Sequence, residues 1–279
     1  MKIGNIDIHL VSDGQIRLDG GGVYGVVPRA IWRNLATPDR KNRVTMGLNC
    51  LLIRTAGKNV LVDTGAGTKH PRRRRALFAM AAGQLSAGLK EHGLEPADVD
   101  IVVLTHLHFD HAGGCTTLGA RGRLLPTFPR ARYIVQQRDW AEATCTNDRT
   151  RPAYLPDDFL PLQEHGQLEL VDGEAEVAPG VWVRRTGGHT AGHQMVLVDS
   201  NGQQAACMGD IFPTHHHLRP HWVTAWDSYP LDTVAMKQDL LTQAEREGWL
   251  MVFGHGTQQH AGRLTRRDGQ LAIEPAAID

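Results

Sequence analysis

Hydrophobic and polar residues alternate through the early part of the chain, a pattern typical of half-buried β-strands. Residues 1–15 (MKIGNIDIHLVSDGQ) alternate in this way and lack the continuous apolar block of a secretory signal. A β-hairpin is predicted over residues 50–62, where CLLI and VLV flank the turn AGKN, and it ends at Asp63. A second hairpin of similar layout, over residues 195–208, ends at Asp210. Each hairpin thus delivers an aspartate to a strand end, and whether the two are copies of one unit stays open.

Apolar residues at three- and four-residue spacing predict helices between and after the hairpins. Residues 72–92 (RRRRALFAMAAGQLSAGLKEH) have this spacing, and Gly93 follows them as a stop signal. Residues 136–144 and 231–247 are also predicted to be helical, and an apolar strand at 249–253 follows the latter. Strands that alternate with helices predict an α/β fold.

The chain of 279 residues is long enough to bury a sizeable core. No Pro/Ser-rich linker divides it, so we expect residues 1–279 to form a single domain. The proline-rich stretch 152–161 is predicted to be an ordered surface loop. The stretch 20–33 (GGGVYGVVPRAIWR) is glycine-rich and then aromatic. A flexible flap, a dimer contact and a loop packed on the domain are all open interpretations of it.

Charge and cysteine usage narrow the class of protein. Thirty basic and thirty acidic residues give a formal net charge of zero, so there is no general attraction to nucleic acid or to an anionic membrane. No apolar run approaches the ~18 to 20 residues needed to span a bilayer. The four cysteines form no C-x-x-C pair, which favours free thiols in a reducing compartment. We therefore expect a cytoplasmic protein that binds neither membranes nor nucleic acid, and we interpret residues 72–75 (RRRR) as a solvated helix start.

The most informative stretch is THLHFDHAGG, residues 105–114, directly after an apolar strand predicted at 99–104. Its three histidines and one aspartate cannot all face one way on a helix or a strand, but a tight loop can fold them around two centres. Imidazole and carboxylate groups suit zinc, and also manganese, iron or cobalt. The pairs expected to face separate ions are His106 with His108, and Asp110 with His111.

Four side chains cannot complete two coordination spheres, so this interpretation requires ligands from other strand ends. The motif GGHTAGH, which contains His189 and His193, follows a strand-like run. Asp210 ends the second hairpin, and His255 follows a third strand within Gly-His-Gly. Glycine flanks the candidate in each case, as expected where backbone must approach a metal closely.

The chain resembles the metallo-β-lactamase-fold metallohydrolases over roughly residues 45 to 260, through HLHFDH, GGHTAGH, the strand-end Gly-Asp and the late Gly-His-Gly. The resemblance implies a four-layer αββα sandwich with a dinuclear metal site along one edge of its two sheets. It also implies that Asp63 and His193 support the ligands without binding metal themselves. The implied ligands are His106, His108 and His189 for one metal, Asp110, His111 and His255 for the other, and Asp210 as a bridge between both.

Two metals ~3.5 to 4 Å apart can share a hydroxide that serves as a nucleophile at neutral pH. One metal polarises the carbonyl or phosphoryl oxygen of the substrate, and the other stabilises the leaving oxygen. Asp110 is suited to carry the proton to the leaving group and Asp210 holds both metals, so these are the predicted catalytic residues. The chain shows no evident Ser-His-Asp arrangement and no phosphate-binding glycine loop. We therefore expect a hydrolase that uses two divalent transition-metal ions, zinc being the first choice.

Within the superfamily the chain looks most like the branch of lactonases and organophosphate hydrolases. This implies a lactone or another small carboxylic ester as substrate, such as an acyl-homoserine lactone or an aryl ester. In homoserine-lactone hydrolases a tyrosine commonly stands three residues after the bridging aspartate, whereas this chain has Pro213. Hydrolysis of phosphotriesters, phosphodiesters including RNA, or β-lactams is the alternative within the same chemistry. A metal-binding protein without turnover is a further alternative, disfavoured by the complete ligand set.

Contacts to a small-molecule substrate are predicted in the second half of the chain. His217, within the cluster His215-His216-His217, and the aromatic residues Trp222 and Tyr229 are candidates to line a pocket for an acyl or aryl group. A solvated histidine-rich loop is the alternative for the cluster. A homodimer through the N-terminal loops or the 72–92 helix stays open.

Overall fold

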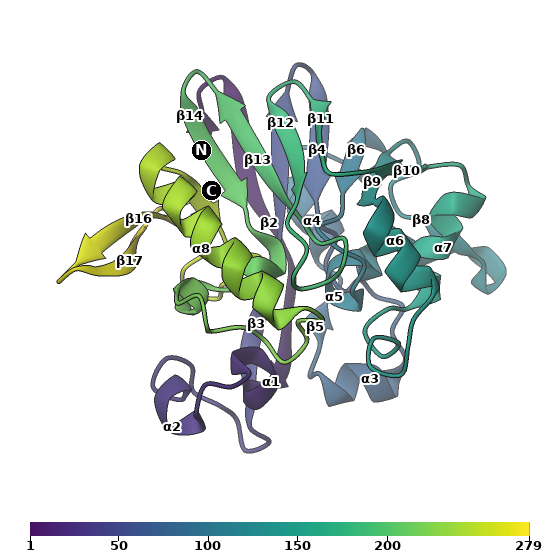
Figure 1. The fold of residues 1–279 in the computed structure, drawn as a ribbon. Helices are drawn as coiled ribbons and strands as arrows, with labels where there is room; N and C mark the ends of the chain where they lie inside the picture. Colours follow the sequence, from purple (N-terminus) through teal and green to yellow (C-terminus); the bar gives the residue numbers. More distant parts are fainter. Residues whose placement is uncertain (279) are drawn as a thin grey trace.

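The alternating strands of the chain assemble into two large sheets (Figure 1). The structure is a computed structural model, and it describes residues 1–278. The first sheet has the strand order β1-β2-β3-β4-β6-β9-β10, with β5 paired to β2. Its strands are β1 (Lys2–Ile3), β2 (Ile6–Asp19), β3 (Arg43–Thr55), β4 (Lys58–Val62), β5 (Ala81–Ala82), β6 (Ile101–Val103), β9 (Arg132–Gln136) and β10 (Leu168–Val171).

The second sheet follows the first along the chain and has the sequential order β11-β12-β13-β14-β15-β16-β17. Its last two strands form a hairpin that projects from the sandwich, drawn in yellow in Figure 1. A separate ribbon is formed by β7 (Thr116–Leu118) and β8 (Leu124–Pro126). The strands of the second sheet are β11 (Glu174–Ala178), β12 (Val181–Arg185), β13 (Gln194–Ser200), β14 (Gln203–Cys207), β15 (Leu250–Val252), β16 (Ala261–Arg267) and β17 (Gln270–Pro275).

The two-residue period of the strands explains why the sheets stack face to face, because successive side chains point to opposite faces. Leu51 and Ile53 of β3 belong to the buried cluster between the sheets, together with Val196 and Val252 of the second sheet. Leu52, between them in sequence, belongs instead to the cluster on the outer face of the first sheet. Both faces of β3 are therefore apolar, and a further layer must cover the outer one.

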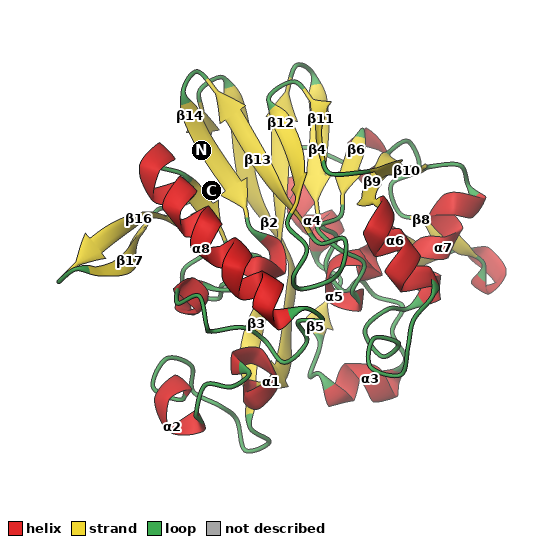
Figure 2. Ribbon diagram, viewed as in Figure 1, coloured by secondary structure: helices red, strands yellow, loops and turns green. Residues whose placement is uncertain are grey.

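Helices provide that layer on both sides of the sandwich, shown in red in Figure 2. Leu89 of α4 (Leu85–Glu91) and Phe159 of α7 (Pro156–Glu164) pack outside the first sheet. Leu240 and Ala244 of α8 (Pro230–Glu247) pack outside the second sheet. The order helix, sheet, sheet, helix confirms the predicted αββα sandwich. The other helices are α1 (Gly20–Tyr24), α2 (Arg29–Trp32), α3 (Arg72–Leu77), α5 (Phe109–Ala112) and α6 (Gln137–Thr144).

Within the described residues, none of these helices combines the length and the apolar character that crossing a membrane requires.

The prediction of one continuous helix over residues 72–92 is wrong. The structure has α3, the short strand β5 and α4 in this stretch. Gly83 adopts a φ of +98°, which helical backbone does not allow, and Asp13 accepts hydrogen bonds from the backbone N–H groups of Gly83 and Leu85. Contact with β2, which carries Asp13, therefore overrides the local helical spacing.

Helices also occur in the stretch predicted as a surface loop, residues 152–161, and in residues 20–33, whose interpretation is open from sequence. Residues 152–161 are irregular only at first, because Pro156 begins α7 at a position where a proline needs no N–H partner. Residues 20–33 contain α1 and α2, and the side chain of Asp19 caps α1 by accepting a hydrogen bond of 3.1 Å from the backbone N–H of Gly22. This cap fixes the chain where it leaves β2.

Replacing Asp13 by alanine is expected to lower the free energy of unfolding by about 3 kcal/mol, because each of three hydrogen bonds to its carboxylate contributes about 1 kcal/mol. Asp13 is 1% exposed and accepts from the backbone N–H groups of Gly67 (2.9 Å), Gly83 (2.9 Å) and Leu85 (3.2 Å). Urea denaturation of the variant and the parent measures the loss. Asp7→Ala, at a position whose side chain is 41% exposed, is the matched control. Equal stability of Asp13→Ala and Asp7→Ala would contradict the assignment.

Candidate metal centre

The predicted ligands lie where strands of both sheets end at one edge of the sandwich. β4 and β6 run parallel, as do β14 and β15, so the carboxyl ends of each pair point the same way. All seven side chains are buried. The first sheet supplies His106, His108, Asp110 and His111 through the segment from β6 to α5, and the second supplies His189, Asp210 and His255 through the loops after β12, β14 and β15.

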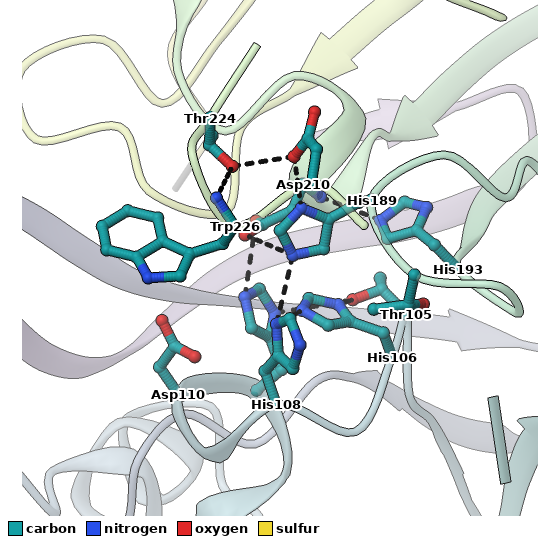
Figure 3. Close-up of polar contacts among 12 residues, drawn as sticks. Thr105, His106, His108, Asp110, His189, His193, Asp210, Thr224 and Trp226 are labelled. Atoms are coloured by element: carbon teal, nitrogen blue, oxygen red, sulfur yellow. Dashed lines mark hydrogen bonds and ion pairs between the residues drawn. The ribbon is translucent and has the colours of Figure 1, made fainter. Parts of the chain in front are cut away.

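Three imidazole rings converge in the first group of candidate ligands (Figure 3). His106 Nε2 lies 3.0 Å from His108 Nδ1, and His189 Nε2 lies 3.1 Å from the same atom. The three nitrogens thus face one another from two different sheets. This is the grouping predicted for one metal.

The second group contains two imidazoles and a carboxylate. His111 Nε2 lies 3.1 Å from His255 Nε2, and the Oδ2 atom of Asp110 lies 3.8 Å from the latter. The donor atoms of these three residues all lie within 4.8 Å of one another. This is the grouping predicted for the other metal.

Asp210 lies between the two groups with one carboxylate oxygen toward each. Its Oδ1 is 3.2 Å from His255 Nε2 and 3.4 Å from His111 Nε2, whereas its Oδ2 is 3.5 Å from His189 Nε2. Oδ1 is buried and has no hydrogen-bond partner among the described residues. A buried carboxylate oxygen without a donor is costly, so this position suits a cation on each side of the carboxylate.

In three of the rings, the Nδ1 atom on the side away from the cluster faces an oxygen that can only accept a hydrogen bond. His111 Nδ1 lies 2.8 Å from the Asp63 carboxylate, and His189 Nδ1 lies 2.7 Å from Asp227 Oδ1. His255 Nδ1 lies 2.7 Å from the backbone carbonyl oxygen of Gly47. In each neutral ring the proton is therefore on Nδ1, and the lone pair of Nε2 points into the cluster.

The same reasoning applies to His106 through Thr105. The hydroxyl of Thr105 donates to the Asp63 carboxylate (2.9 Å to Oδ2), so it accepts from His106 Nδ1 at 3.1 Å. In four neutral rings the Nε2 lone pair thus faces the nitrogen of a neighbouring imidazole at 3.0 or 3.1 Å, and one side of each such contact needs a proton or a cation. Imidazoles held this way by carboxylates and carbonyls are the usual arrangement around a bound metal. The residues present therefore fit two transition-metal ions.

The electrostatics of the cluster agree with this donor set. Burial lowers the pKa of His106 and His108 well below the usual value, and the neighbouring imidazoles lower it further. Burial also lowers the pKa of His111 and His255, but the nearby carboxylates together outweigh it and leave both pKa values raised: Asp210 for both, with Asp63 at His111 and Asp110 at His255. The Asp210 pKa is well below its usual value, because these imidazoles outweigh its burial.

His193 contacts the candidate bridge and not the cluster centre. Its Nε2 accepts a hydrogen bond of 2.9 Å from the backbone N–H of Asp210, and its Nδ1 lies 2.6 Å from Thr186 Oγ1. Gly209 has a φ of +51°, and a Cβ there would collide with His193 Nε2. This glycine is therefore required by close packing of two loops against each other, whereas the sequence suggested crowding against a metal.

A cavity of about 240 Å³ opens beside the cluster. Its floor includes His108, Asp110, His189, Asp210 and His255, so the candidate ligands are accessible from it. Its walls are mostly apolar, with Arg149 as the charged exception. The other wall residues include Met46, Phe78, Phe109, Pro152, Pro213 and Trp226.

The predicted substrate contacts His217, Trp222 and Tyr229 do not line this cavity. His217 is buried, where its ring stacks on Tyr24 (5.3 Å between centroids) and its Nε2 donates to the carbonyl of Val23 at 3.1 Å. Trp222 packs edge-on against Tyr24, and Tyr229 is 44% exposed elsewhere on the surface. The histidine cluster thus stabilises the N-terminal segment, and neither predicted role for it, pocket wall or solvated loop, matches its burial at His217.

Two aspartates that the sequence did not single out support the ligand loops. Asp227 holds His189, as described above. Asp139 of α6 accepts from the backbone N–H of Leu107 (2.7 Å) and from the hydroxyl of Thr190, and thereby joins the two loops that carry the first three histidines. Burial raises the pKa of Asp139 to about 7. An isolated aspartate in a helix or loop gives no sequence signal of such a contact.

Comparisons with known proteins agree with this geometry. Residues 45–255 match the family model of the metallo-beta-lactamase superfamily. An N-acyl homoserine lactonase of Bacillus cereus is 30% identical over 268 residues, which cover 91% of this chain and 95% of the lactonase. A probable metal-dependent hydrolase from Staphylococcus aureus is 31% identical, with a TM-score of 0.90 and 100% of both chains covered. A dizinc quorum-quenching lactonase shares the fold, with a TM-score of 0.82 over 100% of this chain and 97% of its own at 18% identity.

Proposed function

The chain belongs to the metallo-beta-lactamase superfamily of hydrolases, and from this premise we propose that it is a dinuclear hydrolase of lactones or other small carboxylic esters. The observation that carries the dinuclear assignment is the position of Asp210, with one oxygen toward each group of candidate ligands. The choice of ester is supported by the similarity to N-acyl homoserine lactonases at about 30% identity over most of both chains.

When bound, two divalent ions supply a water of lowered pKa and an electrophile for the carbonyl oxygen of the substrate. The chain's own residues then hold and orient the reactants. Asp110 lines the cavity and is 9% exposed, so its carboxylate can accept a proton and return it to the leaving oxygen. Phe109 and Trp226 form apolar walls that exclude bulk water from the ester. Asp63 and Asp227 keep the ligand imidazoles in the required tautomers.

Zinc is the proposed metal, because each group offers four protein donors when Asp210 is counted with it. These donors are neutral imidazoles and carboxylates, which zinc binds in four-coordinate sites. Manganese, iron and cobalt accept the same donors. The metal content of the purified protein decides among them.

Pro213 gives the cavity a feature of its own. It lines the cavity where a tyrosine commonly stands in homoserine-lactone hydrolases, so that hydroxyl is missing. The wall residue Thr224 does not replace it, because its hydroxyl donates to Asp227 Oδ1 at 2.7 Å. Orientation of the substrate carbonyl therefore falls to the metals and to the shape of the cavity.

Removing the metal with a chelator is expected to abolish ester hydrolysis and to lower Tm, since a cation bound only by the folded chain stabilises it. Purified protein should contain about two equivalents of metal, as the two donor groups require. Elemental analysis, thermal unfolding and a lactone hydrolysis assay before and after metal is restored measure these effects. Full activity in metal-free protein would refute the proposal.

A panel of substrates tests the ester assignment separately. Lactones, aryl esters, phosphotriesters, a β-lactam and structured RNA would be assayed side by side with the metal-loaded protein. We expect the highest kcat/KM for a lactone or an aryl ester. Cleavage of the phosphotriester or the RNA with every carboxylic ester intact would replace the proposed substrate class.

A further inference from the structure

A second cavity, of about 850 Å³, adjoins the cavity beside the metal cluster. Phe78 and Pro152 line both cavities, so the two share a wall. We call the second cavity the Arg74 groove. Four basic residues line it against two acidic ones, and apolar residues form much of the rest: Lys41, Lys69, Arg73 and Arg74; Asp157 and Asp158; Leu77, Leu155 and Pro156.

Three of the four cationic side chains that line the Arg74 groove form no ion pair within the described part of the chain. Within residues 1–278 no carboxylate lies within 4.0 Å of the charged groups of Lys41, Arg73 or Arg74. Lys69 differs, because it forms a buried ion pair of 2.7 Å with Asp158. The groove therefore carries an excess of positive charge over an apolar surface.

Arg74 occupies the junction of the two cavities. Its guanidinium carbon lies 4.4 Å from the ring centroid of Phe109 and 5.5 Å from that of Phe78. Nη2 donates to the carbonyl oxygen of Pro152 at 2.8 Å, while Nε is buried without a partner. The guanidinium thus lies over two aromatic rings, where its charge has no carboxylate partner among the described residues. Below it, the ring of His70 packs edge-on against Phe109 at 5.7 Å, with a buried Nε2 that also lacks a partner.

The sizes of the two cavities determine what can occupy them. The 240 Å³ beside the metals is less than the ~300 to 1,000 Å³ of typical ligand pockets. It accommodates the reacting ester or lactone ring, so the rest of a larger substrate must extend beyond it. The Arg74 groove lies next to it, on the other side of the shared Phe78 and Pro152.

We propose that the Arg74 groove binds a carboxylate at the far end of an apolar chain carried by the substrate. The inference rests on the proposed ester hydrolysis and adds the substrate class: esters or lactones whose tail ends in an anion. A guanidinium donates charge-assisted hydrogen bonds to a carboxylate, and partial burial strengthens them. The apolar residues of the groove take up the chain, and the unpaired cations Arg73 and Lys41 add attraction at its rim.

Two γ-lactones with amide-linked tails of equal length, one ending in a methyl group and one in a carboxylate, test this selectivity. The metal-loaded parent should show a KM at least about tenfold lower for the carboxylate-ended lactone, the usual effect of one charge-assisted contact. The ratio of the two KM values should fall toward one in Arg74→Gln and fall partly in Arg73→Gln. Raising the salt concentration should also lower the ratio in the parent, because exposed charges are screened.

Arg72→Gln is the matched control, because Arg72 is exposed on the same helix and does not line the groove. Its KM ratio should equal that of the parent. Equal KM values for both lactones in the parent, or an unchanged ratio in Arg74→Gln, would overturn the groove assignment. Hydrolysis of the methyl-ended lactone would still stand in that case, so the proposed function would survive.

A binding measurement separates the groove from catalysis. Isothermal titration of the metal-free parent with dodecanoate and with dodecanamide needs no turnover. Tighter binding of dodecanoate that is lost in Arg74→Gln and kept in Arg72→Gln would support the groove even if neither lactone were cleaved. Equal binding of the acid and the amide would refute it.

Discussion

Asp210→Ala is expected to lose both metals and to lower kcat/KM for the ester substrate by more than ~100-fold. This exceeds the usual effect of removing a residue that only hydrogen-bonds to a metal ligand. The reason is the position of the carboxylate: Oδ1 lies 3.2 Å from His255 Nε2 and Oδ2 lies 3.5 Å from His189 Nε2. Without it, the two cations would repel each other with no carboxylate between them. Elemental analysis and steady-state kinetics with a lactone measure the two effects.

The control for this variant is Asp239→Ala, because Asp239 is exposed on α8. It should keep both metal content and activity. Far-ultraviolet circular dichroism shows whether Asp210→Ala is folded, and its Tm should match that of the metal-stripped parent. A folded Asp210→Ala protein with about two equivalents of metal would show that the bridge is assigned incorrectly.

Asp63→Asn and Asp227→Asn are expected to weaken different metals, each by roughly 10- to 100-fold in affinity. Asp63 has a φ of +59°, which asparagine also tolerates, so the backbone should be retained. Its carboxylate accepts from His111 Nδ1 and from Thr105, whereas an amide nitrogen there would meet two donors. The proton of His111 would then move to Nε2 and block the lone pair that faces the cluster.

Asp227→Asn should act in the same way on His189, because Asp227 Oδ1 accepts from His189 Nδ1 and from Thr224. The first variant therefore affects the group with His111 and His255, and the second affects the group with His106 and His108. Chelator competition, followed as stepwise loss of two equivalents, distinguishes the two sites. Asp199→Asn on β13 is the control, since among residues 1–278 the Asp199 side chain accepts a hydrogen bond only from Gln204. If Asp63→Asn and Asp227→Asn bound both metal equivalents as tightly as the parent does, the proposed roles would be contradicted.

Local patterns were sufficient to predict the framework of the site. Strand alternation located the hairpins, and β6 followed by H-x-H-x-D-H located the loop that the structure brings to the sheet edge. The helix over residues 72–92 could not be excluded by its own spacing, since contact with β2 and the backbone of Gly83 break it. Such breaks depend on residues distant in sequence.

The cavity walls were harder to predict than the ligands. Histidine and aspartate at metal-ligand spacing can be recognised as candidate ligands from their residue type. An apolar residue becomes part of a cavity wall only through its packing, which its residue type does not reveal. Trp222 and Trp226 are four positions apart, yet Trp222 packs against Tyr24 and Trp226 lines the cavity. Likewise, nothing in the residues around Asp227 indicates a contact with His189. These features follow from how loops fold back over the site.

The two halves of the candidate ligand set come from different sheets, with His106 through His111 from one and His189, Asp210 and His255 from the other. A bound cation would consequently cross-link the two sheets of the sandwich at one edge. Separating the sheets at this edge would require breaking metal–ligand bonds as well as exposing apolar faces. The same ions would then provide both the catalytic activity and the stability of the contact between the sheets, since neither sheet supplies all the ligands of an ion by itself.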